Sequence, residues 1–160
     1  MRKIEINTEI TIFDSIQELP DEIKTLMNAA KKAKANAYAP YSKFKVGAAF
    51  LLENGEIVTG NNQENAAYPS GMCAERVAIW KVSSEFPSII MKVLAITASS
   101  ASQVLTEPVA PCGGCRQTLL EYEQKQAQPI EIYFMGETGK VLKMNSISDL
   151  LPIAFDNTFL

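Results

Sequence analysis

Hydrophobic and polar positions recur with two different periods along this chain, and each period predicts a different element. From Asp21 onward, apolar side chains recur every three or four residues, which is the pattern of an amphipathic helix. Within residues 1–20, isoleucines recur at even spacing, which favours an additional edge strand there. The continuous apolar run at 46–52 predicts a buried strand.

The rest of the chain alternates between helix and strand patterns. Asn54 and Gly55 lie between apolar runs, a strong hairpin signal, so residues 57–59 are expected to form the returning strand. The other expected elements are helices at about 73–83, 113–124 and 146–151, and strands at 93–97, 130–134 and 141–142. This order favours an α/β fold, a three-layer α/β/α sandwich whose hairpin makes the sheet mixed. Without repeats or linkers, residues 1–160 are expected to form one domain.

Composition and charge narrow the function classes. The chain has 160 residues, of which 47% are hydrophobic and 21% charged, ordinary values for a globular protein. Its formal net charge of −3 gives no electrostatic reason to expect nucleic acid or an anionic membrane as a partner. Charges within the first five residues argue against a signal peptide, so we expect a cytoplasmic protein.

Two counts decide the candidate chemistry: there is no histidine, and there are three cysteines. Catalysis by a serine or cysteine paired with histidine is therefore excluded. Cys73 opens one predicted helix, whereas Cys112 and Cys115 open another as a Cys-x-x-Cys pair. Helix N-termini favour thiolates, the form that binds metal. Three thiolates suit zinc and leave a fourth position for water, which is typical of a catalytic site.

Charged residues adjoin these cysteines. Three thiolates around Zn²⁺ leave a net charge of −1, which would weaken the activation of water. We therefore expect Arg76 and Arg116 to donate hydrogen bonds to the sulfurs. Glu75 is the candidate proton carrier. Alternatives are a redox pair, a structural zinc site, three unrelated core thiols and, for Glu75, simple stabilisation of a helix dipole.

The pattern Cys-x-Glu followed by Pro-Cys-x-x-Cys is the signature of zinc-dependent nucleobase deaminases. From about Asp21 to Phe155 the chain resembles the small homotetrameric cytidine deaminases. Five segments carry this resemblance: Tyr38–Ala49 (YAPYSKFKVGAA), Asn62–Pro69 (NQENAAYP), Cys73–Arg76 (CAER), Pro111–Gln117 (PCGGCRQ) and Leu150–Phe155 (LLPIAF). The segments occur in the family's order, which makes the match specific. Gly114 departs from the usual alanine, and residues 1–20 have no counterpart.

The resemblance implies a role for each matching residue. One zinc ion per subunit would be held by the three cysteines, with Glu75 as proton shuttle. Asn62 and Glu64 would bind the ribose hydroxyls. The further residues implied to contact substrate are Phe44, Ala74, Tyr68 and Phe155, the last two across subunit interfaces, while Arg76, Arg116 and Gln117 would support the zinc ligands. Without the resemblance, Asn62 and Glu64 fit a polar loop, and Phe44 and Phe155 fit ordinary apolar anchors.

The implied activity is hydrolysis of cytidine and 2′-deoxycytidine to the uridine nucleosides and ammonia, a step of pyrimidine salvage. A different aminated nucleoside, a nucleoside antibiotic or a polynucleotide is the alternative substrate. A non-catalytic module stabilised by zinc is the other alternative. The acidic balance and the lack of a basic, aromatic-rich channel argue against a polynucleotide.

Overall fold

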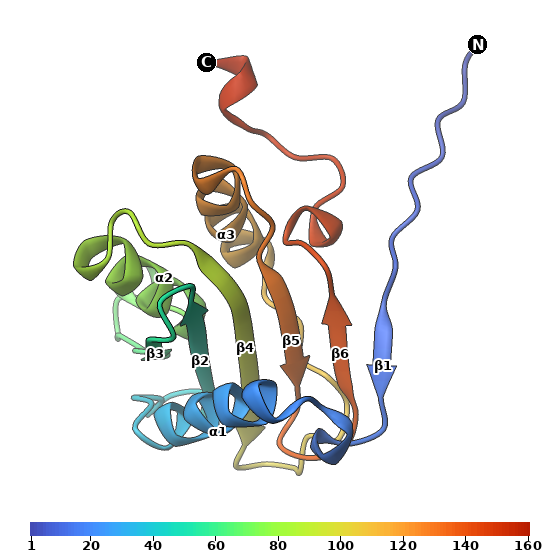
Figure 1. Cartoon of the computed structure of the whole chain (residues 1–160). Helices are drawn as coiled ribbons and strands as arrows, with labels where there is room; N and C mark the ends of the chain where they lie inside the picture. The colour runs from blue at the N-terminus through green and yellow to red at the C-terminus, as the bar shows by residue number, and fades with distance from the viewer.

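The centre of the molecule is a single six-stranded sheet, drawn in Figure 1. A computed structural model describes residues 1–160. The strands lie in the order β1-β6-β5-β4-β2-β3, and β4–β5 is the one parallel pair. Their bounds are Thr11–Phe13 for β1, Phe44–Leu52 for β2, Ile57–Asn61 for β3, Met91–Ser100 for β4, Glu131–Met135 for β5 and Val141–Met144 for β6.

Three helices cover the two faces of this sheet (Figure 1). Helix α1 (Asp21–Ala35) packs on one face, and α2 (Ala74–Glu85) and α3 (Gly113–Gln126) pack on the other. Buried apolar side chains accordingly form two clusters, one of 12 residues beneath α1 and one of 19 beneath α2 and α3. This arrangement confirms the predicted three-layer α/β/α sandwich with a mixed sheet. No helix is both long and apolar enough to cross a membrane.

Two glycines allow helices to approach the strands closely. A Cβ atom at Gly47 in β2 would collide with the carbonyl oxygen of Ala30 in α1. A Cβ atom at Gly60 in β3 would collide with the backbone of Ala78 in α2. Because no side chain intervenes, backbone contact sets the height of α2 above β3. The first turn of α2, which Cys73 precedes, is fixed by this packing.

The predicted elements are confirmed, with small differences at their ends. The hairpin between β2 and β3 turns at Gly55, whose φ of +86° suits glycine. The strand expected at 93–97 is longer and runs from Met91 to Ser100. The short helix expected at 146–151 is a single 3₁₀ turn at Ser148–Leu150.

A buried carboxylate ties the end of α3 to two later segments. Glu123 is 7% exposed and accepts hydrogen bonds from the backbone N–H groups of Ile130, Ile147 and Ser148. The hydroxyl of Ser146 donates to the same carboxylate at 2.7 Å. These bonds hold the start of β5 and the turn after β6 against α3.

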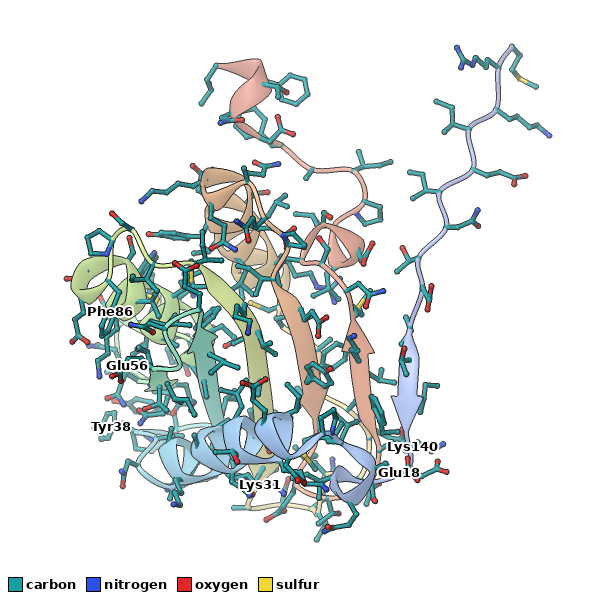
Figure 2. All side chains as sticks on the ribbon, viewed as in Figure 1. Glu18, Lys31, Tyr38, Glu56, Phe86 and Lys140 are labelled. Atoms are coloured by element: carbon teal, nitrogen blue, oxygen red, sulfur yellow. The ribbon has the colours of Figure 1, made fainter.

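The N-terminal segment forms a strand only at its end. β1 pairs with β6 over three residues at one edge of the sheet, and residues 1–10 form no regular structure. Figures 1 and 2 show this segment running away from the sheet beyond β1. The extra strand expected within residues 1–20 is therefore shorter than its isoleucine pattern.

Candidate active site

Three cysteine sulfurs meet where α2 and α3 begin. Cys73 is the N-cap of α2 and Cys112 is the N-cap of α3, while Cys115 lies in the first turn of α3. Their Sγ atoms all lie within 4.8 Å of one another. Cys115 is buried, Cys73 is half-buried and Cys112 is exposed, so the cluster opens to one side.

The pKa values of two cysteines in the cluster, Cys73 and Cys115, are shifted in opposite directions. A hydrogen bond from Cys115 and, to a smaller extent, the guanidinium of Arg76 lower the pKa of the Cys73 thiol to about 5. The same hydrogen bond, together with burial, raises the pKa of Cys115. Cys73 is therefore a thiolate at neutral pH, and Cys115 is the thiol that donates to it. A metal ion bound here would displace this proton, since cysteine ligates as thiolate.

The donor set fits zinc. Zn–S bonds of about 2.3 Å in a tetrahedron place sulfurs about 3.8 Å apart, which agrees with a cluster confined within 4.8 Å. Three cysteine sulfurs and no carboxylate or imidazole form the group, and soft sulfur ligands favour zinc over magnesium or calcium. A set of three also leaves one tetrahedral position for a non-protein ligand.

Arg76 lies against this cluster. Its Nη2 atom donates to the sulfur of Cys73 at 3.5 Å. The guanidinium carbon lies 6.0 Å from the ring centroid of Trp80, one turn later on α2, while the buried Nε atom has no hydrogen-bond partner. The structure thus places a fixed positive charge beside the thiolate, which is the contact expected of this arginine.

Arg116 and Gln117 point elsewhere, contrary to the expectation that they support the sulfurs. Arg116 donates through Nε to the carbonyl of Pro111 at 2.9 Å and through Nη1 to that of Leu150 at 3.0 Å. Gln117 donates to the carbonyl of Phe155 at 2.9 Å. Carbonyl oxygens of the flanking chain therefore occupy these donors, and both side chains anchor segments rather than neutralise thiolates.

Glu75 is buried beside the cysteines. Its side chain is 5% exposed, follows Cys73 in the first turn of α2 and lines a cavity. Burial raises the pKa of the Glu75 carboxyl, and the negative charge of Cys73 raises it further. A raised pKa lets the carboxyl hold a proton more readily than a free glutamate does, which suits a group that must both accept and release protons.

A cavity of about 850 Å³ is lined by Glu75 and by two of the cysteines, Cys73 and Cys112. This volume lies within the range of pockets that hold small organic ligands. Its polar and charged lining residues are Tyr41, Ser42, Asn62, Gln63, Glu64, Asn65, Tyr68, Glu75 and Arg76; the others are Phe44, Val46, Gly71, Met72, Cys73, Ile96, Val109, Ala110 and Cys112. The cavity therefore joins a wall from β2 and β4 to the start of α2.

Asn62 and Glu64 line the cavity but bind protein groups. The amide of Asn62 donates to the carbonyl of Phe44 at 2.9 Å and accepts from the N–H of Val46 at 2.8 Å. Glu64 accepts from the N–H groups of Tyr41 and Ser42, at 2.9 and 3.2 Å, and from the Ser42 hydroxyl. These hydrogen bonds lower the pKa of the Glu64 carboxyl, and the bond from the Ser42 hydroxyl has the largest effect.

The remaining predicted contacts are divided. Phe44 and Tyr68 line the cavity, Ala74 is fully buried beside it, and Phe155 is not among its lining residues. Phe155 is exposed on the C-terminal tail, where its ring stacks on Phe159 at 5.7 Å. Within one chain, the structure therefore does not bring Phe155 to the site.

Sequence reasoning from the residues missed part of the cavity wall. Tyr41 lines the cavity and meets the Tyr68 ring edge-on at 6.4 Å between centroids. Val109 and Ala110, just before the Pro-Cys-x-x-Cys segment, also line it. Tyr41 lies in the segment Tyr38–Ala49 that resembles the deaminase family, and this position could have indicated its role. The hydrophobic periodicity gives no comparable indication for Val109 or Ala110.

Comparison with known proteins agrees with this geometry. The profile of the family described as the cytidine and deoxycytidylate deaminase zinc-binding region matches residues 20–129. A cytidine deaminase of Sporosarcina psychrophila is 39% identical over 134 residues, 84% of this chain and 91% of that protein. One from Halalkalibacterium halodurans is 35% identical over 130 residues, 81% of this chain and 91% of that protein.

Solved structures show the same likeness. The crystal structure of a cytidine deaminase from Burkholderia pseudomallei matches with a TM-score of 0.71 and 37% identity, covering 82% of this chain and 98% of that one. A cytidine deaminase from Mycobacterium tuberculosis matches with a TM-score of 0.64 and 34% identity, covering 83% and 96%.

Proposed function

The chain belongs to the cytidine and deoxycytidylate deaminase family, and from this premise we propose that it hydrolyses cytidine and 2′-deoxycytidine to the uridine nucleosides and ammonia. One observation carries the proposal above the others. Two cysteines of the three-sulfur cluster, Cys73 and Cys112, and a buried carboxyl, Glu75, line one cavity that has the size of a small ligand. A structural zinc site or a redox pair explains neither the cavity nor the carboxyl.

Cys73, Cys112 and Cys115 would hold the zinc ion. When bound, zinc supplies Lewis acidity that lowers the pKa of water and makes a nucleophile available near neutral pH. Arg76, beside Cys73, would draw negative charge from one sulfur and so preserve that Lewis acidity.

Glu75 carries the protons of the reaction. Its carboxylate accepts a proton from the attacking water and delivers it to ring nitrogen 3, which makes carbon 4 electrophilic. The water oxygen bonds to carbon 4, and Glu75 then passes the remaining proton to the amino group, which leaves as ammonia. The raised pKa of Glu75 supports this role because the group must act as base and acid in one cycle.

Residues across the cavity would orient the nucleoside. Phe44 and Ala74 would pack near the base, and Asn62 and Glu64 would bind the ribose hydroxyls. Phe44, Asn62 and Glu64 line the cavity, and Ala74 is buried between the lining residues Cys73 and Glu75, which supports the assignment. Ribose binding would exchange the bonds of Glu64 to the 41–42 turn for bonds to sugar hydroxyls.

We further propose a homotetramer in which Tyr68 and Phe155 of each chain complete a neighbour's site. Both side chains are large, aromatic and more than half exposed in the single chain, at 77% and 60%. Both side chains are therefore accessible to a neighbouring subunit, as the proposal requires. The cytoplasmic location and the role in pyrimidine salvage stay predictions from the sequence.

A nucleoside panel with purified protein tests the function. We expect one zinc per chain and a loss of ultraviolet absorbance with cytidine and 2′-deoxycytidine, with ammonia released in equal amount. Single-stranded polynucleotide is the control substrate, and it should remain unchanged. Zinc-loaded protein that is inert toward both nucleosides would contradict the proposal.

A further inference from the structure

The alternating sequence pattern of the N-terminal segment predicts a longer strand than β1, which covers only Thr11–Phe13. Ile4, Ile6, Ile10 and Ile12, with Thr8 between them, occupy every second position. Charged and polar residues occupy the alternate positions from Lys3 to Thr11. This alternation describes a strand of about ten residues, yet only Thr11–Phe13 pairs within the chain.

β1 stops because its neighbour ends. Thr11 pairs with Lys143, so Ile10 would face Met144, the last residue of β6. Beyond Met144 the chain turns, and Glu123 holds that turn by its backbone. Residues 3–9 therefore have no strand to pair with in their own chain. The four isoleucines remain 49–79% exposed, and Figure 2 shows the segment extending away from the sheet.

We propose that residues 3–13 pair antiparallel with the same residues of a second copy of this chain, about a two-fold axis at Thr8. The partner's residues 3–5 would then lie along the free edge of β1, the outermost strand of the sheet. Two six-stranded sheets would join into one continuous sheet, which covers the exposed β1 edge of each sheet. The pattern is self-complementary, as an isologous contact requires.

Side-chain chemistry selects this register. With the axis at Thr8, the numbers of two paired residues, one from each chain, add up to sixteen. Ile6 therefore lies opposite Ile10 of the second copy, and Ile4 lies opposite Ile12. An axis at Asn7 would set Glu5 opposite Glu9 twice, and like charges directly opposite are destabilising.

An axis at Ile6 would pair Lys3 with Glu9, but only Thr11 of β1 would then have a partner residue, Met1. The paired segments would then form an isolated two-stranded ribbon, which is marginally stable in water. Of these three axes, only the one at Thr8 combines two kinds of Ile–Ile pair, no like-charge pair and continuity with the existing sheet.

Cross-linking through engineered cysteines tests the register. In zinc-loaded full-length protein under mild oxidation, Thr8→Cys should form a disulfide-linked dimer, since directly opposed Cα atoms lie about 4.5–5.5 Å apart. Asn7→Cys is the matched control, because its two copies would lie roughly 8 Å apart and be out of disulfide reach. We expect Thr8→Cys to cross-link at least tenfold faster than Asn7→Cys or Ile6→Cys, with wild type giving the background from native cysteines.

A second comparison separates pairing from random collision. In the Thr8→Cys background, adding Ile4→Ser and Ile6→Ser should slow cross-linking at least tenfold, whereas Glu5→Ser should not. Deaminase activity should be unchanged in all of these variants, because β1 lies at the sheet edge opposite the site strands. Equal cross-linking at positions 7 and 8, or no effect of removing the isoleucines, would overturn the proposal.

Discussion

Helices α2 and α3 both begin at a cysteine, but the side chains that follow do different work. After Cys73, the next residues with functional groups turn into the site: Glu75 is buried at the cavity, and Arg76 donates to the Cys73 sulfur. After Cys112 and Cys115, Arg116 and Gln117 donate to backbone carbonyls of the chain and not to the sulfurs. The start of α2 therefore supplies the reacting and charge-balancing groups, and the start of α3 supplies ligands and anchorage.

The largest expected effect is that of Glu75→Gln. The amide keeps the size of the side chain but cannot carry a proton, so kcat with cytidine should fall by at least about 10²–10⁴-fold while zinc stays bound. Glu85→Gln, at the exposed end of the same helix, is the control and should keep full activity. Turnover within tenfold of wild type for Glu75→Gln would remove the main distinction between the two helix starts.

Arg76→Ala should have a smaller effect than Glu75→Gln, and the effect should be on zinc affinity and on the pKa of Cys73. Loss of the hydrogen bond to Cys73 should weaken zinc binding by about 10–100-fold, measured by competition with a chelator. In metal-free protein, alkylation of Cys73 should titrate with a pKa of about 5. Because Arg76 favours the thiolate, its removal should raise that pKa, so the thiolate is lost at a higher pH as the solution is acidified. An unchanged alkylation profile would show that Arg76 does not act on Cys73.

Arg116→Ala should affect folding rather than the charge of the sulfurs. It removes charge-assisted bonds to the carbonyls of Pro111 and Leu150, so the free energy of unfolding should fall by about 1–3 kcal/mol in denaturant titrations. The alkylation pKa of Cys73 should not move, in contrast to Arg76→Ala. If Arg116→Ala shifted that pKa as much as Arg76→Ala does, the contrast between α2 and α3 would be wrong.

Periodicity and spacing were enough to predict the sandwich and the meeting of three cysteines. The spacing of Arg76 also placed it correctly, because residues three apart on a helix lie on one face. The same argument failed for Arg116, since its acceptor on Leu150 lies 34 residues away in the chain and only the fold brings it near. The extent of β1 failed for a similar reason: it is limited by the length of β6, not by its own pattern.

The buried carboxylate of Glu123 has a mechanical consequence for the metal ligands. It fastens residues 146–148 to the far half of α3, while Arg116 fastens Leu150 to the near half, where two of the sulfurs lie. The segment after β6 is thus bound to α3 at two positions, Arg116 and Glu123. We therefore expect a substitution that displaces residues 146–150 to disturb the spacing of Cys112 and Cys115, although these residues contribute no metal ligand.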